Sequence, residues 1–258
     1  MTDQKIKMRY CFSNKDRSIL LAVLSGIAVN LNAQNFEIEK KHELTLSYGQ
    51  QSITDTYLGI TSTKINSTGV GYFYLNQTSR GQKSLVVDFE YGKQENLRSS
   101  AYLIEFKKGY SILSSKKINN FLGFSVKNGS QFLRSYERNS WTSVNTLSLF
   151  NSFNYSGKKS LLSLNVSIPV AGFVSRPSPG REYEGSVNSM LYSSLSNHVF
   201  TSFHNYQEID LLLNYYRYIS NRVSLSAGLS FSDQNVQMDN SFKRNQIYLR
   251  SGISYYLK

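Results

Sequence analysis

The stretch RNQIYLRSGISYYLK, residues 244–258, ends the sequence and alternates apolar with polar side chains. One parity holds Ile247, Leu249, Ile253, Tyr255 and Leu257. The other parity holds Gln246, Tyr248, Arg250, Gly252 and Ser254. A period of two is typical of a β-strand with two different faces, and a frayed terminus needs no such pattern. The stretch therefore predicts a strand that is held in a sheet up to the end of the sequence.

The same alternation recurs through the rest of the sequence. Ten ranges are predicted as strands: 42–50, 68–76, 84–92, 100–112, 118–127, 143–154, 160–170, 207–218, 222–232 and 245–257. Each has about the length that a tilted strand needs to cross a bilayer. With 19 tyrosines and 15 phenylalanines the chain is also rich in strand formers.

The connections between these ranges alternate in length. Short ones lie at 77–83, 113–117, 155–159 and 219–221. Longer ones lie at 51–67, 93–99, 128–142, 171–206 and 233–244. A strand at 199–206 would run into residue 207 without a turn, so the longest connection adds none to the count. An even strand number and this rhythm predict an all-β fold, a closed antiparallel up-and-down transmembrane β-barrel of about ten strands, with short periplasmic turns and longer external loops.

Alternation alone does not separate a membrane barrel from a soluble sandwich. In a sandwich the apolar face points inward and the polar face outward, whereas in a membrane barrel the apolar face points to lipid and the polar face to the lumen. No apolar run reaches the roughly 20 residues of a membrane-spanning helix, so the chain would enter a membrane as strands. The length of the strands, an export signal and aromatic residues near the strand ends favour the membrane. Those aromatic residues are Tyr48, Tyr91, Phe106, Tyr155, Tyr215, Phe231 and Tyr255. A secreted sandwich, with strands of about five or six residues, remains the alternative.

Residues 1–33 have the features of a cleaved secretory signal peptide. A basic segment precedes the apolar run at 18–31, and Ala33 is suited to cleavage before Gln34. The alternative is a buried first helix. The mature domain is then 34–258, which contains no cysteine because Cys11 lies in the leader. This excludes a disulfide scaffold and a thiolate metal site.

The end of the chain also resembles a known assembly signal. Proteins of the Gram-negative outer-membrane β-barrel superfamily end in a polar residue, a glycine two positions later, and two hydrophobic or aromatic residues separated by one. Arg250, Gly252, Tyr255 and Leu257 match this pattern, although Leu257 stands where an aromatic residue is usual and Lys258 follows it. The resemblance covers 42–257 and implies a small porin-like barrel in the outer membrane, delivered through the periplasm, with outer-membrane lipids and the barrel assembly machinery as partners.

Charged residues of both signs share the polar parity and are predicted to face the lumen: Asp88, Glu90, Glu105, Lys107, Lys127, Asp210 and Arg250. They form either a salt-bridged plug or a narrow polar path. Basic residues also lie in or beside the short connections: Arg80, Lys83, Lys116, Lys117, Lys158, Lys159 and Arg222. They either attract anionic headgroups or are ordinary solvated turn residues. The formal charge of +12 is dispersed along an exported chain, so no nucleic-acid partner is predicted.

The sequence offers one weak arrangement for catalysis. Ser202, His204 and Asp210 are close in sequence near the end of the longest connection. Outer-membrane hydrolases resemble one another in placing a His and a Ser two apart on a strand, but here their order is reversed, and serine is abundant throughout. No cofactor and no metal site is predicted. We therefore predict a non-enzymatic barrel that acts as a narrow porin-like channel or a surface scaffold, with 171–206 as a contact for an external ligand. The alternative is a barrel-embedded hydrolase acting on lipid or peptide.

Overall fold

The computed structural model describes residues 39–115, 117–136, 138–177, 198–202 and 205–257. The predicted signal peptide and His204 lie outside this range. The strands are β1 Glu39–Asp55, β2 Ile60–Gln77, β3 Gly81–Gln94, β4 Leu97–Ser114, β5 Ile118–Arg134, β6 Asn139–Ser156, β7 Ser160–Ser175, β8 His198–Thr201, β9 Tyr206–Tyr218, β10 Val223–Val236 and β11 Phe242–Leu257. Within these described residues, no helix is long and apolar enough to span a membrane.

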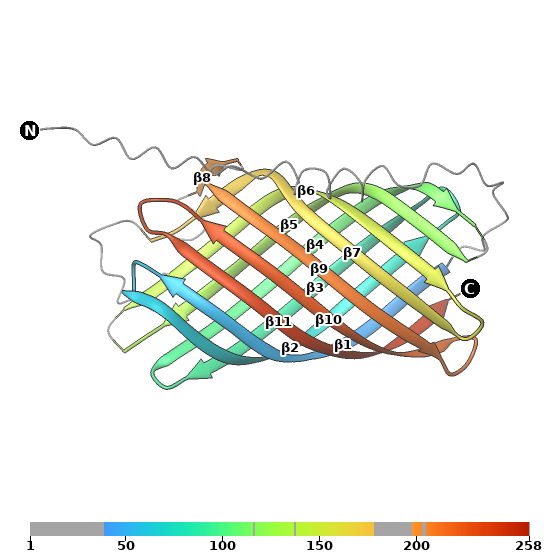
Figure 1. The fold of residues 1–258 in the computed structure, drawn as a ribbon, viewed down its shortest axis with the longest axis horizontal. Coiled ribbons are helices and arrows are strands. Elements are labelled where there is room, and N and C mark those ends of the chain that lie inside the picture. The colour runs from blue at the N-terminus through green and yellow to red at the C-terminus, as the bar shows by residue number, and fades with distance from the viewer. Residues whose placement is uncertain (1–38, 116, 137, 178–197, 203–204, 258) are drawn as a thin grey trace, which may run out of the picture.

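The long strands form one closed barrel in which each strand pairs antiparallel with its neighbours (Figure 1). β1 pairs with β11 from Lys40–Leu257 to Asp55–Phe242, and β6 pairs with β7. These two pairings leave no open edge among the long strands, as a barrel in lipid requires. The prediction of an all-β, closed, ten-stranded antiparallel barrel is confirmed.

The short strand β8 does not change this count. It pairs with Gly172–Ser175 at the end of β7, while β9 pairs with Ser160–Ser167 of the same strand. The backbone N–H groups of Asn205 and Tyr206 both donate to the carbonyl of Ser202. β8 and β9 therefore lie one after the other along the same side of β7.

The strands extend further than predicted at one end of the barrel. β1 runs to Asp55 and β2 begins at Ile60, so most of the expected connection 51–67 is strand. The expected connections 128–142 and 233–244 are shortened in the same way. Only two residues separate β3 from β4, and Glu95 takes a φ of 47° there, as a tight two-residue turn requires. This end of the barrel lies opposite the short turns, the first residue of β1 and the last residue of β11. We call it the external end, and we call the opposite end the periplasmic end.

The middle of the barrel wall is apolar on the outside. On β1 the outward side chains Leu44, Leu46 and Tyr48 are 67%, 62% and 59% exposed. Large apolar side chains are exposed in the same way on all the long strands, including every aromatic residue predicted near the strand ends. A contiguous apolar surface around the whole wall is typical of a lipid-facing belt and excludes a soluble sandwich.

A β-bulge in β7 changes which side chains face inward. The cross-strand register shifts between Leu147 and Ser148 of β6, so that Ala171 and Pro169 of β7 are their partners and Val170 has none. Up to Ile168 the even positions face outward; beyond the bulge Phe173 does so and Val174 is buried. One extra residue reverses the parity of the rest of the strand. Val174 and Arg176 are therefore turned into the barrel.

Candidate functional site

The lumen is the place where ionisable side chains come together. The structure places all seven predicted lumen residues on inward-facing positions of the long strands, with partners of opposite charge or hydrogen-bonding groups. It adds further charged residues above and below them. From the periplasmic end to the external end, the lumen contains a charged layer, a second charged layer with a cavity, and an apolar layer.

The periplasmic layer is built around Lys41 and Glu43. Lys41 Nζ lies 3.1 Å from Glu43 Oε2 and 3.9 Å from the centre of the Tyr216 ring. Glu43 also accepts hydrogen bonds from Ser226 Oγ at 2.6 Å and Tyr216 Oη at 3.2 Å. Both charged side chains are buried, and such a pair is tolerated only when its remaining groups are satisfied in this way. A cavity of about 100 Å³ adjoins the pair.

The middle layer holds the predicted lumen residues. Arg250 Nη2 lies 3.0 Å from Asp88 Oδ1, and Lys107 Nζ lies 2.9 Å from Glu105 Oε2. Lys127 Nζ contacts two carboxylates, Glu208 at 2.7 Å and Asp210 at 2.8 Å.

Glu90 in the same layer accepts from Gln246 Nε2 at 3.0 Å and from Tyr248 Oη at 3.2 Å. A cavity of about 150 Å³ lies among these groups. Arg250–Asp88 and Lys127 with its two carboxylates are matched across strands, Lys107–Glu105 is matched within β4, and Glu90 is held by neutral donors.

Above the middle layer a ring of amides and hydroxyls crosses the lumen. Gln51 Nε2 donates to Ser67 Oγ at 2.7 Å and to Ser99 Oγ at 3.1 Å. Gln131 Nε2 donates to Gln51 Oε1 at 3.0 Å and to Ser99 Oγ at 2.8 Å. These four buried residues come from β1, β2, β4 and β5, so the bonds tie opposite parts of the wall together.

The external end of the lumen is filled with apolar side chains. The buried cluster, which we call the external core, consists of Ile53, Ile65, Leu97, Leu133, Val144, Val174, Tyr206, Val236 and Phe242. Leu58, Ile60 and Met238 pack against it. Its members come from nearly every long strand around the barrel, and several have no exposed surface. Apolar side chains from the described strands are thus packed against one another across the lumen at this level.

A buried ion pair lies against the external core. Arg176 Nη2 donates to Asp55 Oδ1 at 2.8 Å, and its Nη1 donates to Asp55 Oδ2 at 3.2 Å, which is the two-point geometry that makes such pairs strong. Nη1 also reaches the Trp141 carbonyl and Thr142 Oγ1, both at 2.9 Å. The guanidinium lies 5.1 Å from the centre of the Phe242 ring. The pair joins the end of β7 to the end of β1.

The two cavities limit what this lumen can hold. At about 100 and 150 Å³ they are smaller than ligand pockets, which measure roughly 300–1,000 Å³. Each has room for a few water molecules, whose share of liquid volume is about 30 Å³. No group of three or more His, Cys, Asp or Glu side chains in the described chain could hold a metal ion. Below the external core the described lumen therefore has charged side chains around cavities of the size of a few water molecules.

The structure does not bring the weak catalytic candidates together. Ser202 is exposed in the turn between β8 and β9, whereas Asp210 faces the lumen and is held by Lys127. His204 lies outside the described residues. A serine nucleophile needs a base within hydrogen-bonding distance, and no such arrangement is formed between the two candidates that the structure describes.

The four residues of the proposed assembly signal lie at the end of β11. Tyr255 and Leu257 face outward and are 43% and 42% exposed. Gly252 faces inward, and a Cβ there would lie 2.7 Å from the Leu44 carbonyl oxygen and from Ser226 Oγ. Arg250 is bound by Asp88 in the lumen. Gly252 and Arg250 thus have structural roles in the barrel, while recognition by the assembly machinery stays a prediction.

Several lumen residues were missed in the sequence for identifiable reasons. Glu208 shares the parity of Asp210 within the predicted strand 207–218, so the alternation could have found it. Lys41 precedes the predicted start of the first strand by one residue. Asp55 and Arg176 fell in predicted connections. Pro169 is a signal for the bulge that turns Arg176 inward, because proline within a strand is confined to edges and bulges.

No protein-family model matches the sequence, and neither does any curated protein. Among solved structures the barrel is similar to the outer membrane protease OmpT from Escherichia coli, with a TM-score of 0.56, 6% identity, and coverage of 88% of this chain and 100% of that one. It also matches the translocator domain of the autotransporter NalP from Neisseria meningitidis, with a TM-score of 0.41, 12% identity, and coverage of 93% and 94%. The likeness to OmpT is one of fold, and it agrees with the closed barrel and its apolar outer belt.

Proposed function

We propose that this protein is a non-enzymatic outer-membrane barrel that acts as a surface scaffold and does not conduct solutes. The observation that carries the proposal is the external core with the adjoining Asp55–Arg176 pair, which fills the lumen at the external end. Most of the charges below it are paired with one another, which leaves few groups free to attract a passing ion. Open aqueous channels are typical of barrels with about 16 strands.

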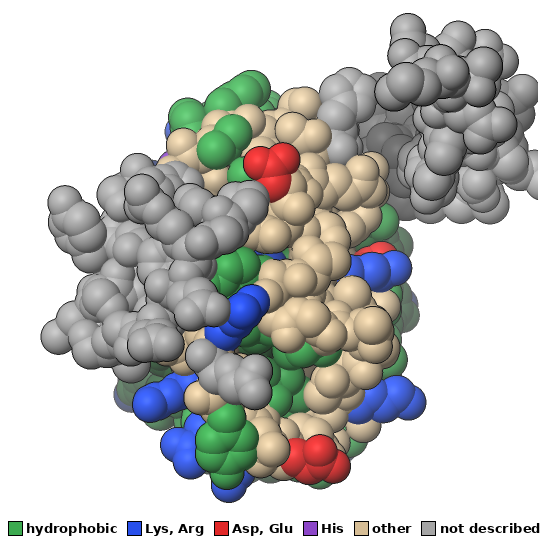
Figure 2. Space-filling view, turned by 90° about the vertical axis from the view of Figure 1, so that its left-hand side faces the viewer, with side chains coloured by type: hydrophobic (Ala, Val, Ile, Leu, Met, Phe, Trp, Pro, Cys, Tyr) green, Lys and Arg blue, Asp and Glu red, His purple; other side chains and the backbone are tan. Residues whose placement is uncertain are grey.

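The external end offers a wall suited to contacts outside the cell. The outward positions at this end are polar. They include three exposed cations that are cross-strand neighbours on β3, β4 and β5, namely Lys93, Arg98 and Arg134. Figure 2 views this end and shows polar and basic side chains over much of its described surface. The external ligand predicted for 171–206 remains part of the proposal, because 178–197 lies outside the described residues.

Planar-bilayer recording tests the proposal. We expect the wild-type barrel to give no conductance steps, and we expect steps from the variant Leu133→Ala/Phe242→Ala, because it removes bulk from the external core. That variant also shows that the barrel has inserted, and heat-modifiable gel migration checks folding of both proteins. Steady conductance of the wild-type protein would support the narrow channel in place of the scaffold.

The hydrolase alternative has a separate test. The purified wild-type barrel is incubated with phospholipid and with a peptide library, and Ser202→Ala is the matched variant. We expect no hydrolysis from either protein. Hydrolysis by the wild type that is lost in Ser202→Ala would contradict the non-enzymatic proposal.

A further inference from the structure

Four neighbouring strands carry polar side chains in one cross-strand row on the outward face of the barrel. Lys40 of β1 pairs with Asn76 of β2, Asn76 pairs with Lys83 of β3, and Lys83 pairs with Lys108 of β4. We call these four residues the lysine row. All three lysines are exposed, and Asn76 is partly buried. The predicted connection 77–83 placed Lys83 in or beside a turn, but β3 begins at Gly81 and Lys83 lies in its wall.

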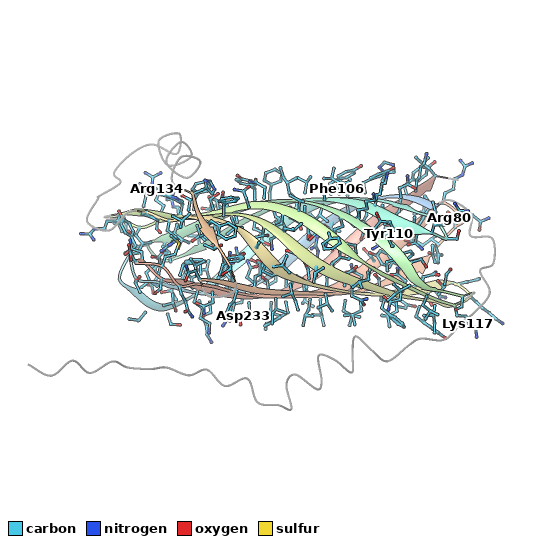
Figure 3. The ribbon with its side chains drawn as sticks, turned by 90° about the horizontal axis from the view of Figure 1, so that it is seen from above. Arg80, Phe106, Tyr110, Lys117, Arg134 and Asp233 are labelled. Carbon is cyan, nitrogen blue, oxygen red and sulfur yellow. The ribbon has the colours of Figure 1, made fainter. Side chains whose placement is uncertain are left out.

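On β4 the lysine row lies within the apolar belt, whereas on β1, β2 and β3 its members lie at the periplasmic border of the belt, two residues or fewer from the strand ends. On β4, Lys108 stands between Phe106 and Tyr110, which are 48% and 56% exposed, and Ile112 beyond them is 54% exposed. Figure 3 shows Phe106 and Tyr110 on the stretch of wall that leads toward Arg80 and Lys117 at the periplasmic end. The row therefore lies on the lipid-facing wall, in the half nearer the periplasm.

This position is unfavourable for unpaired cations. Lysine on the lipid face of a barrel destabilises it, and like charges directly opposite each other on adjacent strands repel. In the described chain none of the three lysines forms an ion pair with a carboxylate. Lys108 Nζ lies 5.4 Å from the centre of the Tyr110 ring, which offers only a weak cation–π contact. Among the described residues the row therefore has no carboxylate partner.

The chemistry of the surroundings indicates what that anion is. Long lysine side chains extend along apolar surface until the ammonium reaches the headgroup level. Adjacent strands are about 4.8 Å apart, so the ammonium groups of Lys83 and Lys108 can reach one phosphate together. We propose that the lysine row binds the phosphate of an anionic phospholipid in the periplasmic leaflet, with the acyl chains against the aromatic side chains that flank it. This inference is independent of whether the lumen conducts.

An acidic segment of a periplasmic protein is the competing occupant. The lipid is favoured because the row is bordered by exposed apolar side chains on both sides along β4, which acyl chains can cover. An acidic protein segment would instead need a surface open to water. The basic turn residues Lys158 and Lys159 have that kind of exposed position at the same end of the barrel, so they provide a comparison.

Native mass spectrometry of the full barrel in nanodiscs tests the proposal. The probes are phosphatidylglycerol and, as a zwitterionic reference, phosphatidylcholine. We expect the wild type to retain phosphatidylglycerol selectively. The affinity of Lys83→Gln/Lys108→Gln for this lipid should be lower by a factor of up to about ten, since each cation near the headgroups contributes to binding. Lys83→Arg/Lys108→Arg should restore binding because it keeps the charge. Lys158→Gln/Lys159→Gln, with the same loss of charge at the same end, should bind like the wild type.

Two results would overturn the proposal. One is equal binding of the two lipids by the wild type, and the other is equal loss of affinity in the turn variant and the row variant. Capture of an acidic periplasmic protein by a cross-linker at position 83, without selective lipid binding, would also overturn it. If the glutamine variant does not fold, protection of Lys83 and Lys108 from amine acetylation in phosphatidylglycerol but not in phosphatidylcholine gives the answer on the wild-type protein.

Discussion

The same strands carry opposite patterns in the two halves of the barrel. In the membrane half, Leu44 and Leu46 face outward and the charged pair Lys41–Glu43 faces the lumen. In the external half of the same strand, Ser52 and Thr54 face outward and Ile53 is fully buried. The alternation continues along the whole strand, but the apolar side chains move from the outward face to the inward face. One continuous strand therefore faces lipid in the membrane half and water in the external half.

The difference teaches that the two halves are stabilised in different ways. The membrane half is stabilised by contacts of its outer face with lipid and by paired charges inside. The external half has its own apolar core, which is favourable because it removes side chains from water. The chain also has one tryptophan, Trp141, which lies at the external end, so its fluorescence reports on that half. Gel migration of the unheated protein reports on the barrel as a whole.

The largest effect is expected from Asp55→Ala. It leaves the Arg176 guanidinium buried without its carboxylate, which typically costs about 3–5 kcal/mol. We expect the free energy of unfolding in guanidinium, followed by Trp141 fluorescence, to fall by that amount. Asp239→Ala, in the exposed turn between β10 and β11, is the control and should change it by about 0.5 kcal/mol or less. An equal effect of the two changes would mean that the pair does not hold the external half together.

The next effect is expected from Leu133→Ala in the external core. Leu133 is 1% exposed, and truncation of such a residue costs about 2–5 kcal/mol because a cavity remains. The matched change is Leu249→Ala on the lipid face, where Leu249 is 63% exposed and acyl chains can fill the space. The same unfolding measurement in phospholipid vesicles should show the larger loss for Leu133. The reverse order would contradict a packed external core.

A charge introduced on the outside separates the halves more directly. We expect Leu44→Arg, in the belt, to lower the free energy of unfolding from vesicles by about 2–4 kcal/mol. Ser52→Arg, on the same face of β1 but in the external half, should change it by about 0.5 kcal/mol or less because the side chain remains in water. Equal costs at the two positions would show that the lipid reaches further toward the external end than the belt indicates.

The smallest effect is expected in the lumen of the membrane half. Tyr216→Phe removes one of the hydrogen bonds that Glu43 accepts, while the contacts of Glu43 with Ser226 and Lys41 remain. We therefore expect the free energy of unfolding to fall by about 1–2 kcal/mol. Tyr215→Phe on the outward face of the same strand is the control. Unfolding of both variants in the same vesicles checks the difference. A loss as large as that of Asp55→Ala would mean that the two halves do not differ in their tolerance of broken polar contacts.

The sequence predicts the membrane half well because lipid imposes one rule on every strand there. The alternation of Leu44, Leu46 and Tyr48 against Thr45 and Ser47 is enough to define β1 and its faces. In the external half the same search stops at Gln50, because polar residues then occupy the outward parity. The change of solvent moves the apolar residues to the other parity, which ends the pattern that was followed, so Ile53 and Asp55 were assigned to a connection.

The contacts between distant strands could be predicted even less. The pairing of Arg250 with Asp88 depends on cross-strand register and barrel curvature, which the alternation does not specify. Arg176 reaches Asp55 only because the bulge at Val170 reverses the parity of β7. The types of lumen residue are therefore visible in the sequence, whereas their partners require the fold.

The pairing of β1 with β11 has a consequence for the time course of folding. Every other pairing between long strands joins segments that follow each other in the sequence, or nearly so, whereas this one joins the two ends of the described chain. Closing so long a segment of chain carries the greatest entropic cost of any contact in the barrel, and contacts between distant residues slow folding. Until the last residues of β11 meet Lys40 and Lys41, both edge strands present unpaired backbone groups that can join another chain. We therefore expect the ladder between β1 and β11 to form last, so that the slowest step of assembly depends on the final residues of β11.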